Sequence, residues 1–262
     1  MAPSNQVSTL GATPELSSTA TAEPSGTTMP APSTKPSAGK PTSSKKPTQP
    51  VEAQVSAECA TKKCIALTFD DGPGEQTAKL LDILNSRGAH ATFFLLGQNA
   101  KRLPDNVKLI ANTPGMEIAN HSWSHPNLRT RSSQKVKWQL AKTNEVLEQL
   151  SGQKVTLHRP PYGSHNKRID KLVGAQGMSV IMWDVDTLDW KHRNTATNVK
   201  KAVSGAKAGN IILMHSIHAP SVAAVPKIVD QLQAKGFTLV TVTELLGPTK
   251  PGQTYFNGGG PK

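Results

Sequence analysis

Ionisable side chains recur along this sequence in combinations that could hold a metal ion and move protons. Asp70 and Asp71 are adjacent, and two histidines, His121 and His125, stand four residues apart. One carboxylate and two imidazoles form the donor set of catalytic zinc sites, which leave a coordination position open for water. The histidines do not form the His-Glu-x-x-His motif, because Ser122 stands where a metalloprotease has its glutamate base. The base must come from elsewhere, and Asp70 is the candidate.

Each of these signals also has a structural explanation when it is taken alone. Asp-Asp-Gly-Pro, at residues 70–73, is common in turns, and two histidines at this spacing also arise by chance. Their position favours a shared function, because further polar residues follow other expected strands. After the strands expected at 155–157, 179–183 and 211–214 these are, in turn, Arg159 and Tyr162; Asp184, Asp186, Asp189 and Trp190; and His215.

Short apolar runs alternate with amphipathic stretches, which is the pattern of a parallel α/β fold. The expected strands cover residues 65–69, 91–96, 116–119, 155–157, 179–183, 211–214 and 238–242. The expected helices cover residues 77–87, 106–112, 166–175, 196–206 and 222–234, with a longer one between a cap at Ser132 or Ser133 and a stop at Gly152. About seven strands, with no Gly-x-Gly-x-x-Gly turn after the first, favour a barrel over a dinucleotide-binding sheet. In such barrels the functional residues gather at the C-terminal ends of the strands.

Composition divides the chain into three parts. Residues 1–56 are mostly Ser, Thr, Pro, Ala and Gly without apolar periodicity, which predicts a disordered tether. Residues 57–247 form the expected single domain, and residues 248–262 a flexible tail. No apolar run is long enough to span a membrane, and no signal peptide follows Met1. Because such tethers often follow an export signal, we expect a secreted or cell-wall protein; the alternative is a cytoplasmic protein with an unstructured extension.

The two cysteines, Cys59 and Cys64, flank four residues just before the first expected strand. Their spacing matches no complete zinc motif, and a disulfide is favoured over two free thiols. The formal net charge is +12. It is compatible with nucleic acid, with an anionic cell-wall polymer, or with a solvated surface that has no dedicated ligand. Few aromatic residues stand among the basic ones, which argues against nucleic acid.

Five segments together resemble the motifs of carbohydrate esterase family 4, the polysaccharide deacetylases that share the NodB homology domain. They are residues 68–73 (Thr-Phe-Asp-Asp-Gly-Pro), 121–125 (His-Ser-Trp-Ser-His), 159–163 (Arg-Pro-Pro-Tyr-Gly), 186–190 (Asp-Thr-Leu-Asp-Trp) and 213–215 (Leu-Met-His). They occur in the family's order. The resemblance implies a distorted (β/α) barrel and a metal-dependent hydrolase that removes N-acetyl groups from an N-acetylglucosamine polysaccharide.

The resemblance assigns a cofactor and a base. Asp71, His121 and His125 would bind one divalent metal ion, with zinc expected first and cobalt as the other usual metal of the family. Asp70 would be the general base that takes a proton from the attacking water, and Arg159 would hold its carboxylate in place.

The resemblance also assigns the remaining catalytic and substrate-binding residues. His215 would be the general acid, paired with Asp189, which keeps the imidazole charged. The backbone N–H of Tyr162 would contribute to the oxyanion hole. Trp190 and Leu213 would line the pocket for the acetyl methyl group.

One position departs from the family pattern. Many relatives have Asp directly after the histidine that acts as general acid, whereas this chain has Ser216 after His215. The change leaves the catalytic assignments intact and bears on the loop that holds His218, which we expect at the rim of the site. The remaining histidines have no motif around them and receive no role: His90, His158, His165 and His192.

The segment 213–246 is most similar to peptidoglycan and chitin-oligomer deacetylases, which makes N-acetylglucosamine polymers the expected substrate, and a monomer is expected. The alternatives are an acetylxylan O-deacetylase with the same machinery and a catalytically inactive relative that binds the cell wall. The inactive relative is disfavoured because every motif residue that would carry chemistry is present. A nucleic-acid-binding protein would explain the charge and leave the motifs unexplained.

Overall fold

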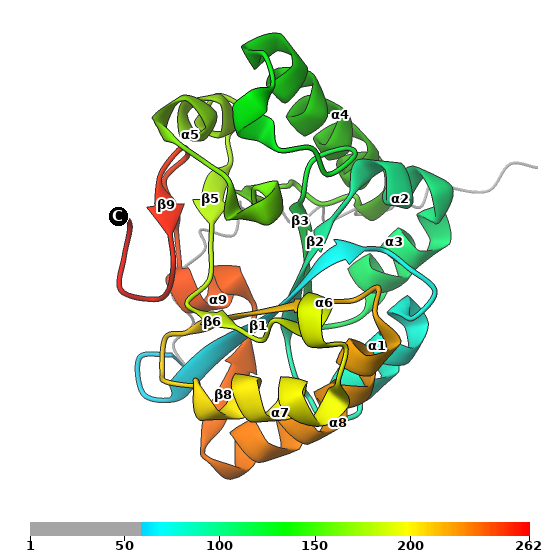
Figure 1. The fold of residues 1–262 in the computed structure, drawn as a ribbon, viewed down its shortest axis with the longest axis vertical. Coiled ribbons are helices and arrows are strands. Elements are labelled where there is room, and N and C mark those ends of the chain that lie inside the picture. Colours follow the sequence, from blue (N-terminus) through cyan, green and yellow to red (C-terminus); the bar gives the residue numbers. More distant parts are fainter. Residues whose placement is uncertain (1–58) are drawn as a thin grey trace, which may run out of the picture. The chain divides into compact units, whose positions relative to one another are not determined.

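The structure, a computed structural model, describes residues 59–262 as alternating strands and helices (Figure 1). The strands are β1 (Lys63–Gly72), β2 (Ala91–Leu95), β3 (Met116–Asn120), β4 (Leu157–His158), β5 (Ser179–Ile181), β6 (Val185–Asp186), β7 (Ile211–His215), β8 (Phe237–Val240) and β9 (Thr254–Tyr255). The helices are α1 (Thr77–Asn85), α2 (Gly97–Arg102), α3 (Pro104–Asn112), α4 (Ser133–Ser151), α5 (Lys167–Gly174), α6 (Asp189–His192), α7 (Thr195–Ser204), α8 (Ala219–Ala234) and α9 (Val242–Leu246). The expected tether, residues 1–56, lies outside the described residues.

The strands form one parallel sheet that curves into an incomplete barrel. Its order is β6-β7-β1-β2-β3-β4-β5-β9, and β8 pairs with the first half of β1. All strand ladders are parallel. No ladder joins β6 to β9 within residues 59–262, so the barrel stays open between them. The predicted α/β barrel is confirmed, and each of the seven expected strands is present.

The central strand β1 is buried along almost its whole length, which explains its continuous apolar run. The ring of Phe69 stacks on that of Phe93 in β2, with 5.4 Å between their centroids. The register places polar strand ends next to one another. Asp70 of β1 pairs with His215 of β7, and the end of β3 pairs with β4 through Asn120 and His158. The sheet therefore brings the ends of four strands to one side of the barrel.

The long helix α4 ends where the sequence predicts. The side chain of Ser132 accepts a hydrogen bond from the backbone N–H of Lys135, which satisfies a free donor of the first turn. Gly152 closes the helix with a φ of 68°, a left-handed conformation that glycine adopts without steric cost.

Two strands are shorter in the structure than the sequence predicts. β5 ends at Ile181 rather than at residue 183, and the chain resumes as the separate strand β6. β8 ends at Val240 rather than at residue 242, because Thr241 caps helix α9. The side chain of Thr241 accepts from the N–H of Glu244, and Glu244 accepts from the N–H of Thr241. This reciprocal pair begins a helix within the apolar run.

The expectation of a flexible tail at residues 248–262 is wrong. This segment contains β9, which pairs with β5. Tyr255 is buried, and its hydroxyl accepts a hydrogen bond from the N–H of Lys250. Apolar contact and a strand ladder, neither visible in a Gly/Pro-rich stretch, hold the segment on the domain.

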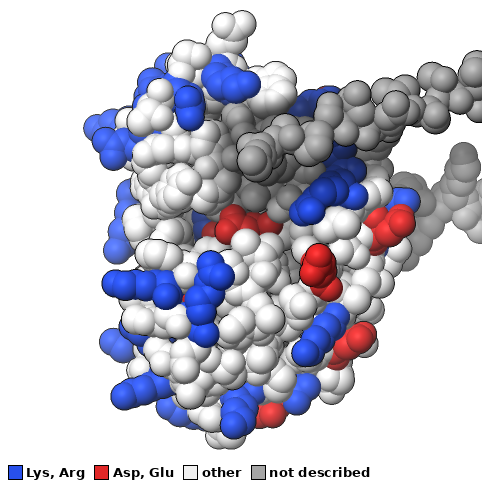
Figure 2. Space-filling view, turned by 45° about the vertical axis from the view of Figure 1, so that its right-hand side comes forward, with Lys and Arg blue, Asp and Glu red and all other residues white. Residues whose placement is uncertain are grey.

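The expected disulfide, the basic charge of the domain and the expected absence of a membrane-spanning segment can each be compared with the described residues. A disulfide joins Cys59 and Cys64. Residues 1–58 contain four Lys and four Glu, so the net charge of +12 belongs to the described part. Figure 2 shows Lys and Arg spread over the visible face rather than gathered in one patch. Among the described helices, none has the length and apolar character needed to cross a bilayer.

Candidate active site

A cavity of about 370 Å³ opens at the C-terminal ends of the strands. Its lining residues are Asp70, Asp71, His121, His125, Pro160, Tyr162, Gly163, Trp183, Asp186, Trp190, Leu213 and His215. Eight of the ten residues expected in the site are among them. The other two, Arg159 and Asp189, are fully buried and bond to lining residues. The structure therefore brings all ten together.

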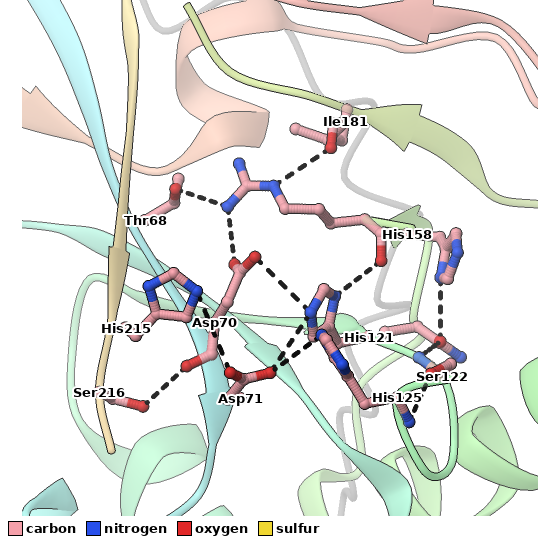
Figure 3. A network of polar contacts seen from close by, with 12 residues as sticks. Thr68, Asp70, Asp71, His121, Ser122, His125, His158, Ile181, His215 and Ser216 are labelled. Carbon is pink, nitrogen blue, oxygen red and sulfur yellow. Dashed lines mark hydrogen bonds and ion pairs between the residues drawn. The ribbon is translucent and has the colours of Figure 1, made fainter. Parts of the chain in front are cut away.

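Three potential metal donors converge in this cavity. The ligand atoms of Asp71, His121 and His125 all lie within 4.8 Å of one another. Oδ1 of Asp71 is 3.5 Å from Nε2 of each histidine. This oxygen is buried and accepts no hydrogen bond from the described residues, which would be costly unless a cation occupied the space. Figure 3 shows both rings directed at Asp71. The donor set fits a divalent cation such as zinc.

His121 is held in the form that a metal ligand requires. Its Nδ1 donates to the backbone carbonyl of Arg159 at 2.7 Å, which leaves the lone pair of Nε2 directed at Asp71. Burial lowers the pKa of His121 to about 3. The ring is therefore neutral over the working range of pH.

The loop between the two histidines is strained, and buried side chains fix it. Ser122 and His125 both have left-handed φ angles, 70° and 57°. The N–H of Ser122 donates to Oδ1 of Asn120, and the N–H of His125 donates to Oγ of Ser122. Oε1 of Gln139 on α4 accepts from the N–H groups of Trp123 and Ser124. Such strain persists only where surrounding contacts hold it, and functional sites are where it concentrates.

Asp70 forms a buried ion pair with Arg159, whose Nη1 lies 2.7 Å from Oδ1 of Asp70. Arg159 also donates to the hydroxyl of Thr68 and, through Nε and Nη2, to the carbonyls of Ile181 and Met182. Burial raises the pKa of Asp70, while the charge of Arg159 opposes the rise. Arg159 therefore fixes the carboxylate in one orientation facing the cavity.

His215 lies on the opposite side of the aspartates from His121 and His125 (Figure 3). Its Nδ1 is 2.8 Å from Oδ1 of Asp189, and its backbone N–H donates to Oδ2 of the same residue. Burial lowers the pKa of His215, but the hydrogen bond and the charges of Asp189, Asp70 and Asp71 outweigh burial and raise it. The partner carboxyl responds in the opposite direction, because its bonds to His215 outweigh burial and lower the pKa of Asp189. This pair favours a protonated imidazole.

Sequence and structure comparisons agree on the relatives of this chain. The family model described as polysaccharide deacetylase matches residues 57–181. A chitin deacetylase of a Pestalotiopsis species is 36% identical over 206 residues, which cover 76% of this chain and 68% of that protein. The chain belongs to the polysaccharide deacetylase family. Its expected membership of carbohydrate esterase family 4 is confirmed.

Two further relatives of this chain are informative. A solved structure described as T48 deacetylase with substrate has a TM-score of 0.71 and 44% identity, covering 75% of this chain and 98% of that one. The peptidoglycan-N-acetylglucosamine deacetylase PgdA of Listeria monocytogenes is 40% identical over 199 residues, or 75% of this chain. The matched part is 42% of the length of the Listeria protein.

The walls of the cavity combine exposed aromatic rings with one buried aliphatic side chain. Tyr162 is 69% exposed, has a left-handed φ of 61°, and sets its ring edge-on to His125 at 4.5 Å. Trp190 is 48% exposed, whereas Leu213 is buried at the cavity wall. A sugar ring can stack on the exposed aromatic faces, and a small apolar group can contact the leucine.

Several residues of the site are not singled out by the sequence. Trp183 and Asp186 line the cavity, although the sequence places them only at a strand end and within a motif. Behind the metal donors, the side chain of Asn120 bonds to Asn144 and to His158. Burial lowers the pKa of His158 to about 3, so this ring is a neutral support for the site. Contacts between residues 24 and 38 positions apart leave no local sequence signal.

Proposed function

We propose that this chain removes N-acetyl groups from the N-acetylglucosamine residues of a cell-wall polysaccharide, either peptidoglycan or chitin oligomers. The carrying observation is that one cavity holds a three-residue donor set, a carboxylate fixed by an arginine, and a histidine paired with a carboxylate. Hydrolysis of an amide needs all three groups. The names of the Listeria and Pestalotiopsis relatives support both the reaction and the choice of polymer.

The proposed cofactor is one divalent ion, zinc, held by Asp71, His121 and His125. When bound, it supplies Lewis acidity that makes water a stronger acid and polarises the acetyl carbonyl. The buried, unbonded Oδ1 of Asp71 and the neutral ring of His121 support this assignment. Cobalt has the same ligand preferences and is the second candidate.

The side chains around the donor set move the protons. Asp70, held by Arg159, takes a proton from water as the water oxygen attacks the acetyl carbonyl carbon. The backbone N–H of Tyr162 stabilises the negative charge that develops on the carbonyl oxygen. His215, kept protonated by Asp189, then gives its Nε2 proton to the amide nitrogen. The C–N bond breaks, and acetate and the free amine leave.

The remaining assignments concern the substrate and the setting of the protein. Trp190 and Leu213 enclose the acetyl methyl group, which restricts the pocket to short acyl groups. The protein acts outside the cell or at its wall as a monomer, and its net charge of +12 favours contact with anionic wall polymers. An O-acetyl ester would meet the same groups, so acetylxylan is the second candidate substrate.

Mass spectrometry of N-acetylglucosamine oligomers treated with the protein tests the proposal. With zinc or cobalt present we expect each removed acetyl group to lower the mass by about 42 Da, the loss of C2H2O that hydrolysis by activated water produces. A chelator should abolish the change, and added metal should restore it. Acetate release from acetylated xylan alone would establish the esterase instead. No release from either substrate by metal-loaded protein would contradict both activities and favour the inactive wall-binding relative.

A further inference from the structure

Among the described residues, backbone strain marks one position that is neither part of the site nor next in sequence to a residue of it, Arg193. Six non-glycine residues among residues 59–262 have positive φ angles: Asp71, Ser122, His125, Tyr162, Leu188 and Arg193. The first four belong to the site, and Leu188 directly precedes Asp189. Arg193 is the sixth, with a φ of 47°. Because such strain concentrates where function maintains it, Arg193 is a candidate functional residue.

Arg193 is held against helix α6, which carries Asp189, the carboxylate partner of the proposed acid His215. It caps α6, and its backbone N–H donates to the carbonyl of Asp189. Its Nε donates to the carbonyl of Trp190 at 3.1 Å. The guanidinium is therefore fixed against the backbone of Trp190, a residue that lines the cavity. Within the described chain, no carboxylate forms an ion pair with it.

The positive charge of Arg193 acts on His218, which is a neighbour of the proposed acid His215. The ring of His218 lies 6.0 Å from that of His215. Burial, followed by the positive charge of Arg193, lowers the pKa of His218. Arg193 therefore lies close enough to this side of the site for its positive charge to act on a ring beside His215.

The cavity offers no guanidinium or ammonium group to a carboxylate beside the reacting sugar, because its positive groups, His215 and the proposed zinc, face the reacting acetyl group. Its walls contain the carboxylates of Asp70, Asp71 and Asp186, and no Lys or Arg lines it. The buried Arg159 is already paired with Asp70. A substrate carboxylate beside the reacting sugar would therefore have to meet its cation at the rim. A guanidinium binds a carboxylate through two parallel hydrogen bonds, which gives geometric selectivity as well as affinity.

We propose that Arg193 is a specificity-determining residue that binds a carboxylate next to the deacetylated sugar, so that the chain prefers a carboxylate-bearing N-acetylglucosamine glycan to a neutral one. The inference rests on the proposed deacetylase function and narrows its substrate class. In a glycan that alternates N-acetylglucosamine with N-acetylmuramic acid, the carboxylate comes either from the lactyl group or from an attached peptide.

Acetate release by the zinc-loaded protein tests the inference on three substrates of equal sugar length. They are a neutral N-acetylglucosamine oligomer, an alternating glycan with free lactyl carboxylates, and the same glycan with peptides attached. We expect the wild type to have a higher kcat/KM on at least one of the carboxylate-bearing glycans. The preferred glycan identifies the source of the carboxylate. In Arg193→Gln we expect the ratio of kcat/KM, carboxylate-bearing to neutral, to fall about tenfold, mainly through KM.

Two further variants separate recognition from general effects. Arg193→Lys keeps the positive charge but cannot donate two parallel hydrogen bonds from one planar group. It should retain part of the preference for carboxylate-bearing glycans. Lys191→Gln removes the same charge from an exposed side chain of α6 and should leave kcat/KM unchanged on all three substrates. Equal loss on all substrates in Arg193→Gln would show that the residue only supports α6 and would overturn the inference. Activity without any preference in the wild type would also overturn it. If the wild type acts on none of the substrates, the proposed function fails, and this inference fails with it.

Discussion

Asp189 uses both of its carboxylate oxygens on His215, one on the backbone N–H and one on the ring. In Asp189→Asn the negative charge is lost, and the pKa of His215 falls because burial then acts with less opposition. A general acid must be protonated, so activity disappears as the pH rises through its pKa. We expect the alkaline limb of the pH profile of kcat to move to lower pH in the variant. An unchanged limb would show that another group supplies the proton.

Asp70 and Asp71 are adjacent, yet the structure separates their surroundings. Asp70 is paired with Arg159, whereas Asp71 belongs to the donor set. We expect Asp70→Asn to retain one equivalent of zinc and to lose about 10²- to 10⁴-fold in kcat, the usual contribution of a general base. Asp71→Asn is the matched variant and should lose the metal. Metal content by elemental analysis, together with acetate release, checks both. Intact turnover in Asp70→Asn would refute its role as the base.

Among single residues, the sequence predicts those that face the cavity and two that hold them, Arg159 and Asp189, but it misses the support from Asn120 and Gln139. Asp70, His121 and His215 stand in short motifs, so local sequence is enough to single them out. The support from Asn120 and Gln139 depends on partners 15 or more positions away, which only the fold brings near.

Helix α4 positions the histidine loop through a single buried side chain. Gln139 accepts from two backbone N–H groups of the loop and donates to the hydroxyl of Ser124. In Gln139→Ala those N–H groups lose their acceptor, so we expect the free energy of unfolding to fall by about 2 kcal/mol. Looser histidines should also weaken zinc affinity about tenfold or more. Urea unfolding of the metal-free protein and competition with a zinc chelator measure the two effects.

Lys137→Ala is the matched control, because Lys137 is exposed on the same helix. Its stability should change by less than about 0.5 kcal/mol. Normal zinc affinity in Gln139→Ala would show that the loop keeps its shape without α4.

Element boundaries follow the sequence where capping residues are typical and depart from it elsewhere. Ser132 and Gly152 cap the two ends of α4 in the structure, as the sequence predicts. Helix α6 has Leu188 before it and Arg193 after it, both left-handed, at positions where a sequence pattern would require Gly or Asn. The short helix is therefore not predicted, although it carries Asp189.

At the scale of the whole domain, the C-terminal segment is packed against the sheet through β9. Tyr255 of β9 is 5% exposed, and its backbone carbonyl accepts from the N–H of Met182, just after β5. We expect Tyr255→Ala to lower the free energy of unfolding by about 3 kcal/mol, as for other large buried aromatic side chains. Tyr162→Ala removes the same group from an exposed position and should leave stability nearly unchanged. Equal stabilities of Tyr255→Ala and wild type in urea would mean that β9 does not stabilise the domain.

The overall architecture is predictable because alternation of strands and helices has few solutions, and the barrel is one of them. The tail is not predictable in the same way. β9 is two residues long and follows a Pro/Gly-rich stretch, so no periodicity announces it. Its pairing depends on β5, more than seventy residues earlier.

The two edge strands of the open barrel are very short. The strands at its margins, β6 and β9, have two residues each. On the outer side of β9, the carbonyl of Thr254 accepts from the N–H of Lys262, and Pro261 stands opposite Tyr255 with no N–H to offer. Long unpaired edges recruit strands from other molecules and lead to aggregation. Because its margins are this short, the barrel can stay unclosed without presenting a long backbone edge to which a second molecule could add a strand.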